Sequence, residues 1–160
     1  MPLLVNLDEL KESDVTLSGA LPAADLDLDT HDALIRPGNT LDYRVTVSQT
    51  EDDLVLRGRL SMEFACDCVR CLEPFTLPLT LEDWLAHGEL AGEDALPRVG
   101  EDVDLTRLAR EDILLGLPQH PLCDSGCRGM PPPGGEPSAA APPSDASASA
   151  WAQLDKGTRD

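Results

Sequence analysis

The sequence predicts an α+β fold, with an antiparallel sheet of several strands, open or barrel-like, and one late helix. Three runs, at residues 41–47, 54–66 and 75–81, alternate apolar and polar side chains, which is typical of half-buried strands. A single stripe of apolar residues at helical spacing follows at residues 104–117. Because the strands come first and the helix late, the pattern favours an antiparallel sheet over alternating βαβ units.

The run at residues 54–66 is the clearest strand. Arg57 and Arg59 lie on its polar face, and the opposite face carries Leu54, Leu56, Gly58, Leu60, Met62, Phe64 and Cys66. The next run contains Pro78, which has no N–H to donate to a neighbouring strand, so this run is expected at a sheet edge or a bulge.

The helix is expected to begin near Asp104, a good N-cap residue, and to end before Pro118. Its predicted apolar stripe contains Leu105, Leu108, Ala109, Ile113 and Leu117. Residues 15–17 and 25–29 show weaker strand patterns.

Composition divides the chain into a folded domain at residues 1–128 and a disordered tail at residues 129–160. Residues 131–150 contain six Pro, six Ala, four Ser and two Gly, a composition that cannot bury enough apolar surface to offset the entropy of ordering. Beyond them, Trp151 and Leu154 are spaced for one helical turn, and we expect this short motif to contact a partner.

Charge limits the classes of function. Thirty Asp and Glu against twelve Lys and Arg give the 160-residue chain a net charge of −18. A stand-alone nucleic-acid binder is therefore not expected, since it needs a basic surface. No apolar run approaches the ~20 residues that cross a membrane, and the first residues lack the basic start of a signal peptide. We therefore expect a cytoplasmic protein with no membrane partner, and with reduced thiols.

Five cysteines carry the most specific chemical signal. Cys68 and Cys71 lie between two predicted strands, at a hairpin tip, and Cys123 and Cys127 follow the predicted helix. Two such pairs are able to complete a tetrahedral zinc site. The alternative is that they are small, semi-apolar residues packed at a bend. Cys66 continues the apolar alternation of its strand and is expected in the core.

Two motifs resemble a known family. Residues 68–75 read CVRCLEPF and resemble the C-x-R-C-L-x-P-F signature of YceD-like proteins, the large ribosomal RNA subunit accumulation proteins. Residues 111–118 and 121–123 read EDILLGLP and PLC, similar to the family's later motif. The similarity extends to the closing motif of Trp151, Leu154 and Lys156.

The resemblance also shows a departure. Many cysteine-rich members carry a further C-x2-C pair, and the corresponding positions here are Pro131 and Gly134. The matching set is then reduced to Cys68, Cys71, Cys123 and Cys127, four residues as a zinc site needs.

The resemblance implies a bacterial-type ribosome-biogenesis factor that supports the accumulation of large-subunit ribosomal RNA. The acidic charge favours an adaptor for a basic large-subunit ribosomal protein or a pre-ribosomal particle. Two alternatives stay open: direct RNA binding by an Arg-bearing sheet face, or a zinc or thiol sensor. The candidate residues for contact with a partner or RNA are Arg57, Arg59, Arg70, Trp151 and Leu154. Alternatively, Arg70 donates hydrogen bonds that orient the cysteine site.

An enzyme is not expected, nor is a small-molecule substrate. The sequence contains no phosphate-binding loop, no G-x-G-x-x-G and no G-x-S-x-G motif. Glu111 and Asp112 are adjacent on the predicted helix, where neighbours point about 100° apart, so we interpret them as exposed helix surface rather than a catalytic pair.

Overall fold

The computed structural model describes residues 2–28 and 33–131. Its largest element is an antiparallel four-stranded sheet in the order β2-β3-β4-β5. These strands are β2 (Val15–Pro22), β3 (Ile35–Thr50), β4 (Asp53–Asp67) and β5 (Pro74–Glu89). A small second sheet has the order β1-β7-β6, formed by β1 (Leu4–Asn6), β7 (Asp102–Asp104) and β6 (Arg98–Val99).

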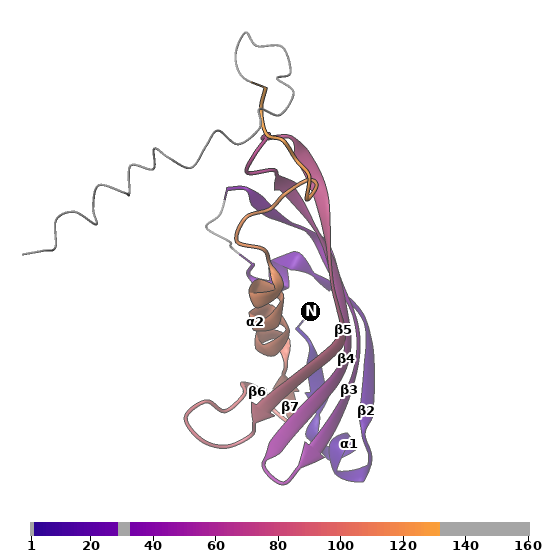
Figure 1. Cartoon of the computed structure of the whole chain (residues 1–160). Coiled ribbons are helices and arrows are strands. Elements are labelled where there is room, and N and C mark those ends of the chain that lie inside the picture. Colours follow the sequence, from indigo (N-terminus) through magenta and orange to yellow (C-terminus); the bar gives the residue numbers. More distant parts are fainter. Residues whose placement is uncertain (1, 29–32, 132–160) are drawn as a thin grey trace, which may run out of the picture. The chain divides into compact units, whose positions relative to one another are not determined.

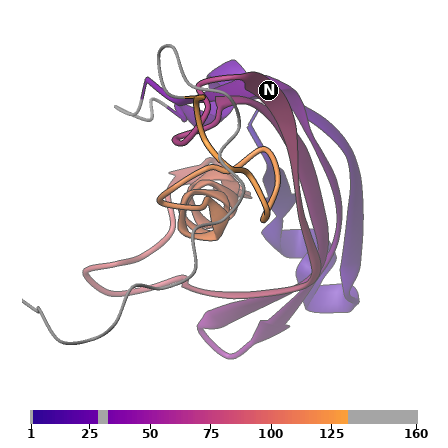
Figure 2. The same cartoon turned by 45° about the horizontal axis from the view of Figure 1, so that its top comes forward.

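One longer helix, α2 (Thr106–Gly116), lies on the concave side of the large sheet (Figure 1). Two shorter helical segments are α1 (Leu7–Glu12) and a 3₁₀ turn, η1 (Ala23–Leu26). Figure 2 shows the large sheet curving around α2, which is seen nearly end-on. The α+β class with its late helix is confirmed. The barrel-like alternative is wrong, because β2 and β5 remain the two edges of an open sheet. None of the described helices has the length and apolar character to span a membrane.

Strand register explains the core. Apolar residues of β4 pair with apolar residues of β3, as Leu60 does with Tyr43 and Leu56 with Val47, and they face α2 and the small sheet. The predicted alternation of β4 is confirmed: its core-facing side chains are buried, including Leu54, Leu56, Leu60, Phe64 and Cys66. Pro78 lies in β5, an edge strand of the sheet, as its missing N–H predicts.

Two predictions of secondary structure need correction. The weak strand pattern at residues 25–29 is wrong: the backbone forms η1 and then turns at Asp27, whose φ of 46° is left-handed, so that Leu26 and Leu28 both reach the core. Aspartate tolerates this conformation better than most residues. The helix α2 begins at Thr106, and Asp104 is the last residue of β7; its carboxylate still accepts the N–H of Thr106 at 2.9 Å.

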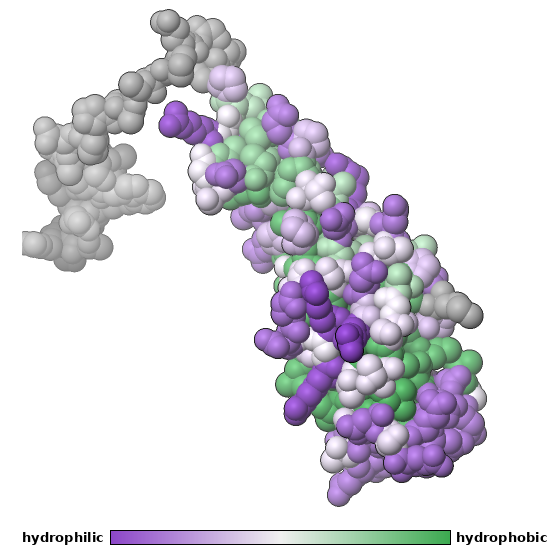
Figure 3. Space-filling model, turned by 90° about the vertical axis from the view of Figure 1, so that its right-hand side faces the viewer, coloured by the Kyte–Doolittle hydropathy of each residue, from purple (hydrophilic) through white to green (hydrophobic). Residues whose placement is uncertain are grey.

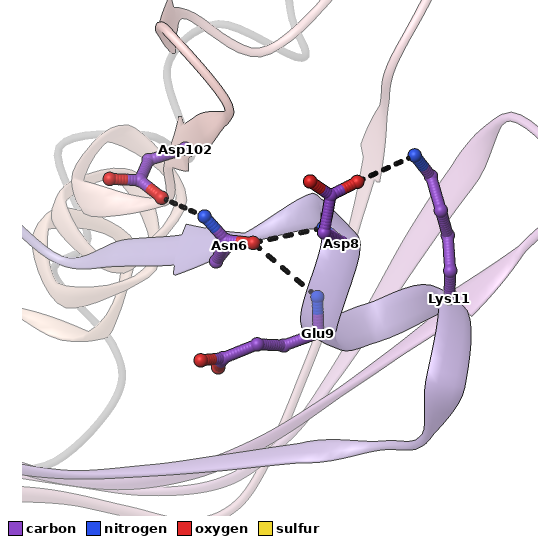
Figure 4. Close-up of polar contacts among 5 residues, drawn as sticks. All are labelled: Asn6, Asp8, Glu9, Lys11 and Asp102. Carbon is purple, nitrogen blue, oxygen red and sulfur yellow. Dashed lines mark hydrogen bonds and ion pairs between the residues drawn. The ribbon is translucent and has the colours of Figure 1, made fainter.

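One side chain, that of Asn6, links α1 to the small sheet (Figure 4). The Oδ1 atom of Asn6 caps α1 by accepting the N–H groups of Asp8 (3.0 Å) and Glu9 (3.4 Å). The Nδ2 atom of Asn6 donates to Asp102 Oδ1 at 2.8 Å, which connects α1 to β7. Lys11 pairs with Asp8 at 2.8 Å on the exposed side of the same helix.

Gly58 is required where β3 and β4 approach. A Cβ atom at this position would collide with the carbonyl oxygen of Arg44 and lie 2.7 Å from the Cα atom of Val45. We expect Gly58→Ala to lower the free energy of unfolding by about 1–3 kcal/mol, the usual cost of overpacking, as measured by urea denaturation. In Gly19→Ala the nearest atom is the movable hydroxyl of Tyr43 at 3.0 Å, so this control is expected to stay within about 0.5 kcal/mol of wild type. Equal stability of the two variants would contradict the prediction.

Candidate metal centre

The first cysteine pair lies in the hairpin loop that joins β4 to β5. Cys68 closes the loop through its backbone: its N–H donates to the carbonyl of Glu73 at 3.0 Å, and its carbonyl accepts the N–H of Leu72 at 2.9 Å. Leu72 adopts a left-handed φ of 61°, which reverses the chain within a few residues. The tight turn brings Cys68 and Cys71 to the same side, as the two-residue spacing predicts.

The second cysteine pair lies in the segment that follows α2, at residues 117–129. Two hydrogen bonds hold this segment against the hairpin: the N–H of Val69 donates to the carbonyl of Pro121 at 3.0 Å, and Arg70 Nη1 donates to the carbonyl of Cys127 at 3.0 Å. Asp124 shapes the turn between the cysteines by accepting the N–H of Gly126 at 2.6 Å. Figure 1 shows the two segments together at one end of the sheet.

The four sulfur atoms of these segments converge. The Sγ atoms of Cys68, Cys71, Cys123 and Cys127 all lie within 4.8 Å of one another. Cys68 and Cys127 are 3.8 Å apart, and Cys71 and Cys123 are 3.7 Å apart. In a tetrahedral zinc site with Zn–S bonds of about 2.3 Å, the sulfurs are separated by about 3.8 Å. The donor set and its spacing therefore fit a tetrahedral four-thiolate site.

The thiols influence one another's ionisation. Backbone N–H groups, chiefly those of Cys123 and Cys71, stabilise the thiolate of Cys68 and lower its pKa to about 6. The neighbouring sulfurs of Cys68 and Cys71 raise the pKa of Cys123 to about 12. The pKa of Cys71 is also raised: the backbone N–H of Glu73 works against this, but burial and the thiols of Cys68 and Cys127 outweigh it. Four thiolates in so small a volume require a cation.

Cys66 is outside this group. Its side chain is fully buried in β4, and its thiol points to the carbonyl of Phe64 at 3.9 Å. The structure therefore places Cys66 in the core, as the alternation of its strand predicts. The loop is also anchored beside Cys66, where Asp67 forms a two-bond ion pair with Arg36, with N–O distances of 2.9 and 3.0 Å. This guanidinium holds the pKa of the Asp67 carboxyl below its usual range.

The predicted arginines occupy two places. Arg70 contacts the second cysteine segment, as described, whereas Arg57 and Arg59 lie exposed on the outer face of the large sheet. Arg44 of β3 is the direct cross-strand partner of Arg59, and Arg59 also forms an exposed ion pair with Glu82 at 3.2 Å. The remaining predicted contact residues, Trp151 and Leu154, lie outside the described residues.

Sequence reasoning missed the role of Asp112. It is half-buried, and its carboxylate accepts the indole N–H of Trp84 at 2.6 Å, so it is not simply exposed helix surface. Trp84 itself lies within β5 and is 5% exposed. A buried tryptophan needs an acceptor for its N–H, so the sequence indicates that a partner for Trp84 exists. Only the packing of α2 against β5 identifies that partner as Asp112.

Fold and site together define a small α+β protein in which a tetracysteine cluster joins a β-hairpin to the chain beyond its helix. The sequence profile of the family described as large ribosomal RNA subunit accumulation protein YceD matches residues 56–156, which is more than half of the chain. The chain therefore belongs to the YceD family. The family's name describes a role in the accumulation of large-subunit ribosomal RNA and names no catalytic activity.

The chain is also similar to three individual mycobacterial proteins. Uncharacterised proteins of Mycobacterium bovis and of two strains of Mycobacterium tuberculosis are each 28% identical over 116 residues, which covers 68% of this chain and 56% of theirs. The chain thus matches about half the length of these relatives. No solved structure matches significantly.

Proposed function

We propose that this protein is a non-enzymatic ribosome-biogenesis factor that supports the accumulation of large-subunit ribosomal RNA as an acidic adaptor. Its partner is a basic large-subunit ribosomal protein or the pre-ribosomal particle that contains one. The family match carries the first part of the proposal. The distribution of acidic side chains supports the second.

The end of the sheet opposite the cysteines is formed by α1, the β3–β4 turn, the end of β5, the β5–β6 loop and the β6–β7 turn (Figure 1). The N–H of Leu7 donates to the carbonyl of Glu101, and the N–H of Leu90 donates to the carbonyl of Asp52. The exposed acids of this end are Asp8, Glu9, Glu12, Asp14, Glu51, Asp52, Glu89, Glu93, Asp94 and Glu101. We call this surface the acidic end.

The acidic end suits a cationic protein. Clustered charge of one sign accelerates the encounter with a partner of opposite charge and disfavours partners of the same sign. Ribosomal RNA is a polyanion, so this end repels it, whereas a basic protein is attracted. The chain's net charge of −18 acts in the same direction at long range.

A second candidate function, direct RNA binding, is favoured by one observation. Arg44 and Arg59 lie directly opposite each other on neighbouring strands, an arrangement that costs stability, and Arg57 lies beside them. Among the described residues, neither Arg44 nor Arg57 forms an ion pair or a side-chain hydrogen bond. Figure 3 views this outer face, where strongly hydrophilic side chains gather over the middle of the sheet. Two unpaired guanidinium groups are suited to phosphate.

The acidic residues around this arginine group weaken the RNA alternative. Asp42 precedes Arg44, Glu82 pairs with Arg59, and Asp83 lies beside Glu82 on β5. Phosphate would have to approach these carboxylates, so we rank RNA binding below the adaptor function.

We also propose that the tetracysteine cluster binds one structural zinc ion. Zinc would connect the hairpin to the segment beyond α2 through Cys68, Cys71, Cys123 and Cys127. Such sites contribute about 10 kcal/mol or more in small zinc modules, which is comparable to the net stability of a whole domain. The third function considered, a zinc or thiol sensor, would use the same residues with a weakly held ion.

The zinc proposal predicts about one zinc per chain after purification under reducing conditions, measured by elemental analysis. Cys68→Ser is expected to lose the metal and to unfold at a lower temperature, because three thiolates are left around the ion. Cys66→Ala is the matched control, since Cys66 lies two residues away and outside the cluster; it should keep its zinc. Substoichiometric, readily exchanged metal would favour a sensor instead, and a metal-free, stable wild type would leave the cysteines as packing residues.

The adaptor proposal predicts that a pull-down with the full chain enriches a basic large-subunit ribosomal protein, and that nuclease treatment leaves the enrichment intact. Contact through charge also predicts that the enrichment falls as salt rises. Recovery of RNA alone, lost on nuclease treatment and with no ribosomal protein, would contradict the adaptor.

The RNA alternative makes its own prediction. If the arginine group binds RNA, Arg57→Glu with Arg59→Glu should reduce binding of a labelled large-subunit RNA fragment by at least tenfold in a filter-binding assay, since each lost phosphate contact weakens binding. Arg107→Glu, at an exposed position of α2, reverses one charge elsewhere and serves as the control. Equal binding by all three proteins would exclude the sheet face as an RNA site.

A further inference from the structure

An apolar hollow lies between the edge strand β5 and the end of α2. It has a volume of about 490 Å³. Leu81, Trp84 and Leu85 line it from β5, and Leu115 and Gly116 line it from α2. Leu85 is 63% exposed and Leu115 is 82% exposed, so two large apolar side chains face water on either side of the hollow.

The hollow results from three local features. The register of β5 against β4 shifts between the Gly58–Trp84 pair and the Leu60–Leu81 pair, so β5 bulges at this point. Trp84 is fixed because its indole N–H donates to Asp112. Gly116 lets the end of α2 pack closely on β5, since a Cβ atom there would lie 3.2 Å from the side chain of Leu79 and 3.6 Å from that of Leu81.

The charges around the hollow select its occupant. The two charged residues that line it, Asp83 and Asp112, are both acids, and no basic residue lines it. Glu82 lies next to Asp83 and is also exposed. One base, Arg57, lies opposite Leu85 on β4, where the acids Glu82, Asp83 and Asp112 outnumber it. An RNA strand would bring phosphate to these carboxylates. A second copy of this chain, with its net charge of −18, would bring acid to acid. A positively charged segment with an apolar side chain fits both the carboxylates around the hollow and its apolar lining.

We propose that this hollow is the docking site for a cationic segment of a partner protein, which inserts an apolar side chain between Leu85 and Leu115. The inference rests on the adaptor function and adds the place and the chemistry of the contact. The acidic end attracts a basic partner at long range, and the hollow provides the short-range apolar contact that charge alone lacks. Apolar anchors surrounded by polar residues are the usual source of affinity at protein interfaces.

Trp84 allows the contact to be measured directly. The chain has two tryptophans, so Trp151→Phe leaves Trp84 as the single indole at the floor of the hollow. Three synthetic peptides of equal length serve as probes: one of alternating Lys and Leu, one of alternating Lys and Ser, and one of alternating Glu and Leu. We expect the Lys–Leu peptide to shift the Trp84 emission to shorter wavelength and to bind at least tenfold more tightly than either of the others.

Variants test whether the hollow is the binding site. Leu85→Ser with Leu115→Ser should weaken binding of the Lys–Leu peptide at least tenfold, and the double variant should fold normally because both side chains are largely exposed. Val99→Ser is the matched control, since Val99 is 60% exposed on β6 and does not line the hollow. As a second variant, Asp83→Lys should weaken binding and reduce its dependence on salt.

Each outcome decides between occupants. Equal binding of the Lys–Ser peptide, or equal binding by the double variant and wild type, would overturn the docking site. A dimer in sedimentation that the double variant abolishes would assign the hollow to a second copy and overturn it as well. If the pull-down recovers a basic ribosomal protein equally with wild type and the double variant, the adaptor function stands and the docking site fails. If the Lys–Leu peptide binds as expected but no ribosomal protein is recovered, the adaptor function fails instead.

Discussion

A mismatch of lengths governs this structure. The strands β4 and β5 contain 15 and 16 residues and so extend for about 50 Å, whereas the 11-residue helix α2 covers about 16 Å. One helix cannot cover the concave face of such a sheet. The N-terminal segment and the small sheet cover one end, where Leu3, Val5 and Val103 are buried. At the other end, the β4–β5 hairpin is held by an irregular segment, residues 117–129.

The cysteines lie beside the half-buried part of the edge strand. The core-facing residues of β5 from Phe75 to Leu81 are only partly buried, whereas Trp84 and Ala86, farther from the hairpin, are buried. A small apolar core gives little stability at such an end, and metal sites commonly take its place in small domains. The tetracysteine cluster therefore joins two segments at an end of the sheet that α2 does not reach.

The parts that the sequence predicts correctly are those that local periodicity determines. Alternation identified β4 and β5, and the apolar stripe identified α2, because each pattern records which side of one element is buried. Pro78 indicated the edge position of β5. Residue spacing likewise identified both cysteine pairs. That the sheet stays open, that residues 7–12 form the short helix α1, and that Trp84 bonds to Asp112 depend on contacts between segments far apart in the chain, so no local pattern reports them. The left-handed Asp27 misled the prediction for the same reason: buried Leu26 and Leu28 fit either a strand or a turn.

Charge and apolar surface are separated along the same molecule, and this separation bears on how a partner would bind. Ten exposed carboxylates lie at the end opposite the cysteines, and their field would orient the proposed basic partner before contact. That field falls within about 8 Å at physiological salt and gives little specificity by itself. Leu85 and Leu115, beside Asp83 and Asp112, provide the complementary property, a small apolar surface that excludes water at short range. Leu85, which lines the hollow, is the direct cross-strand partner of Arg57, so the hollow reaches the edge of the arginine-bearing outer face of the sheet. A partner bound at the hollow would therefore lie beside Arg57, so the proposed adaptor contact and RNA binding by the arginine group would compete for the same edge of β5.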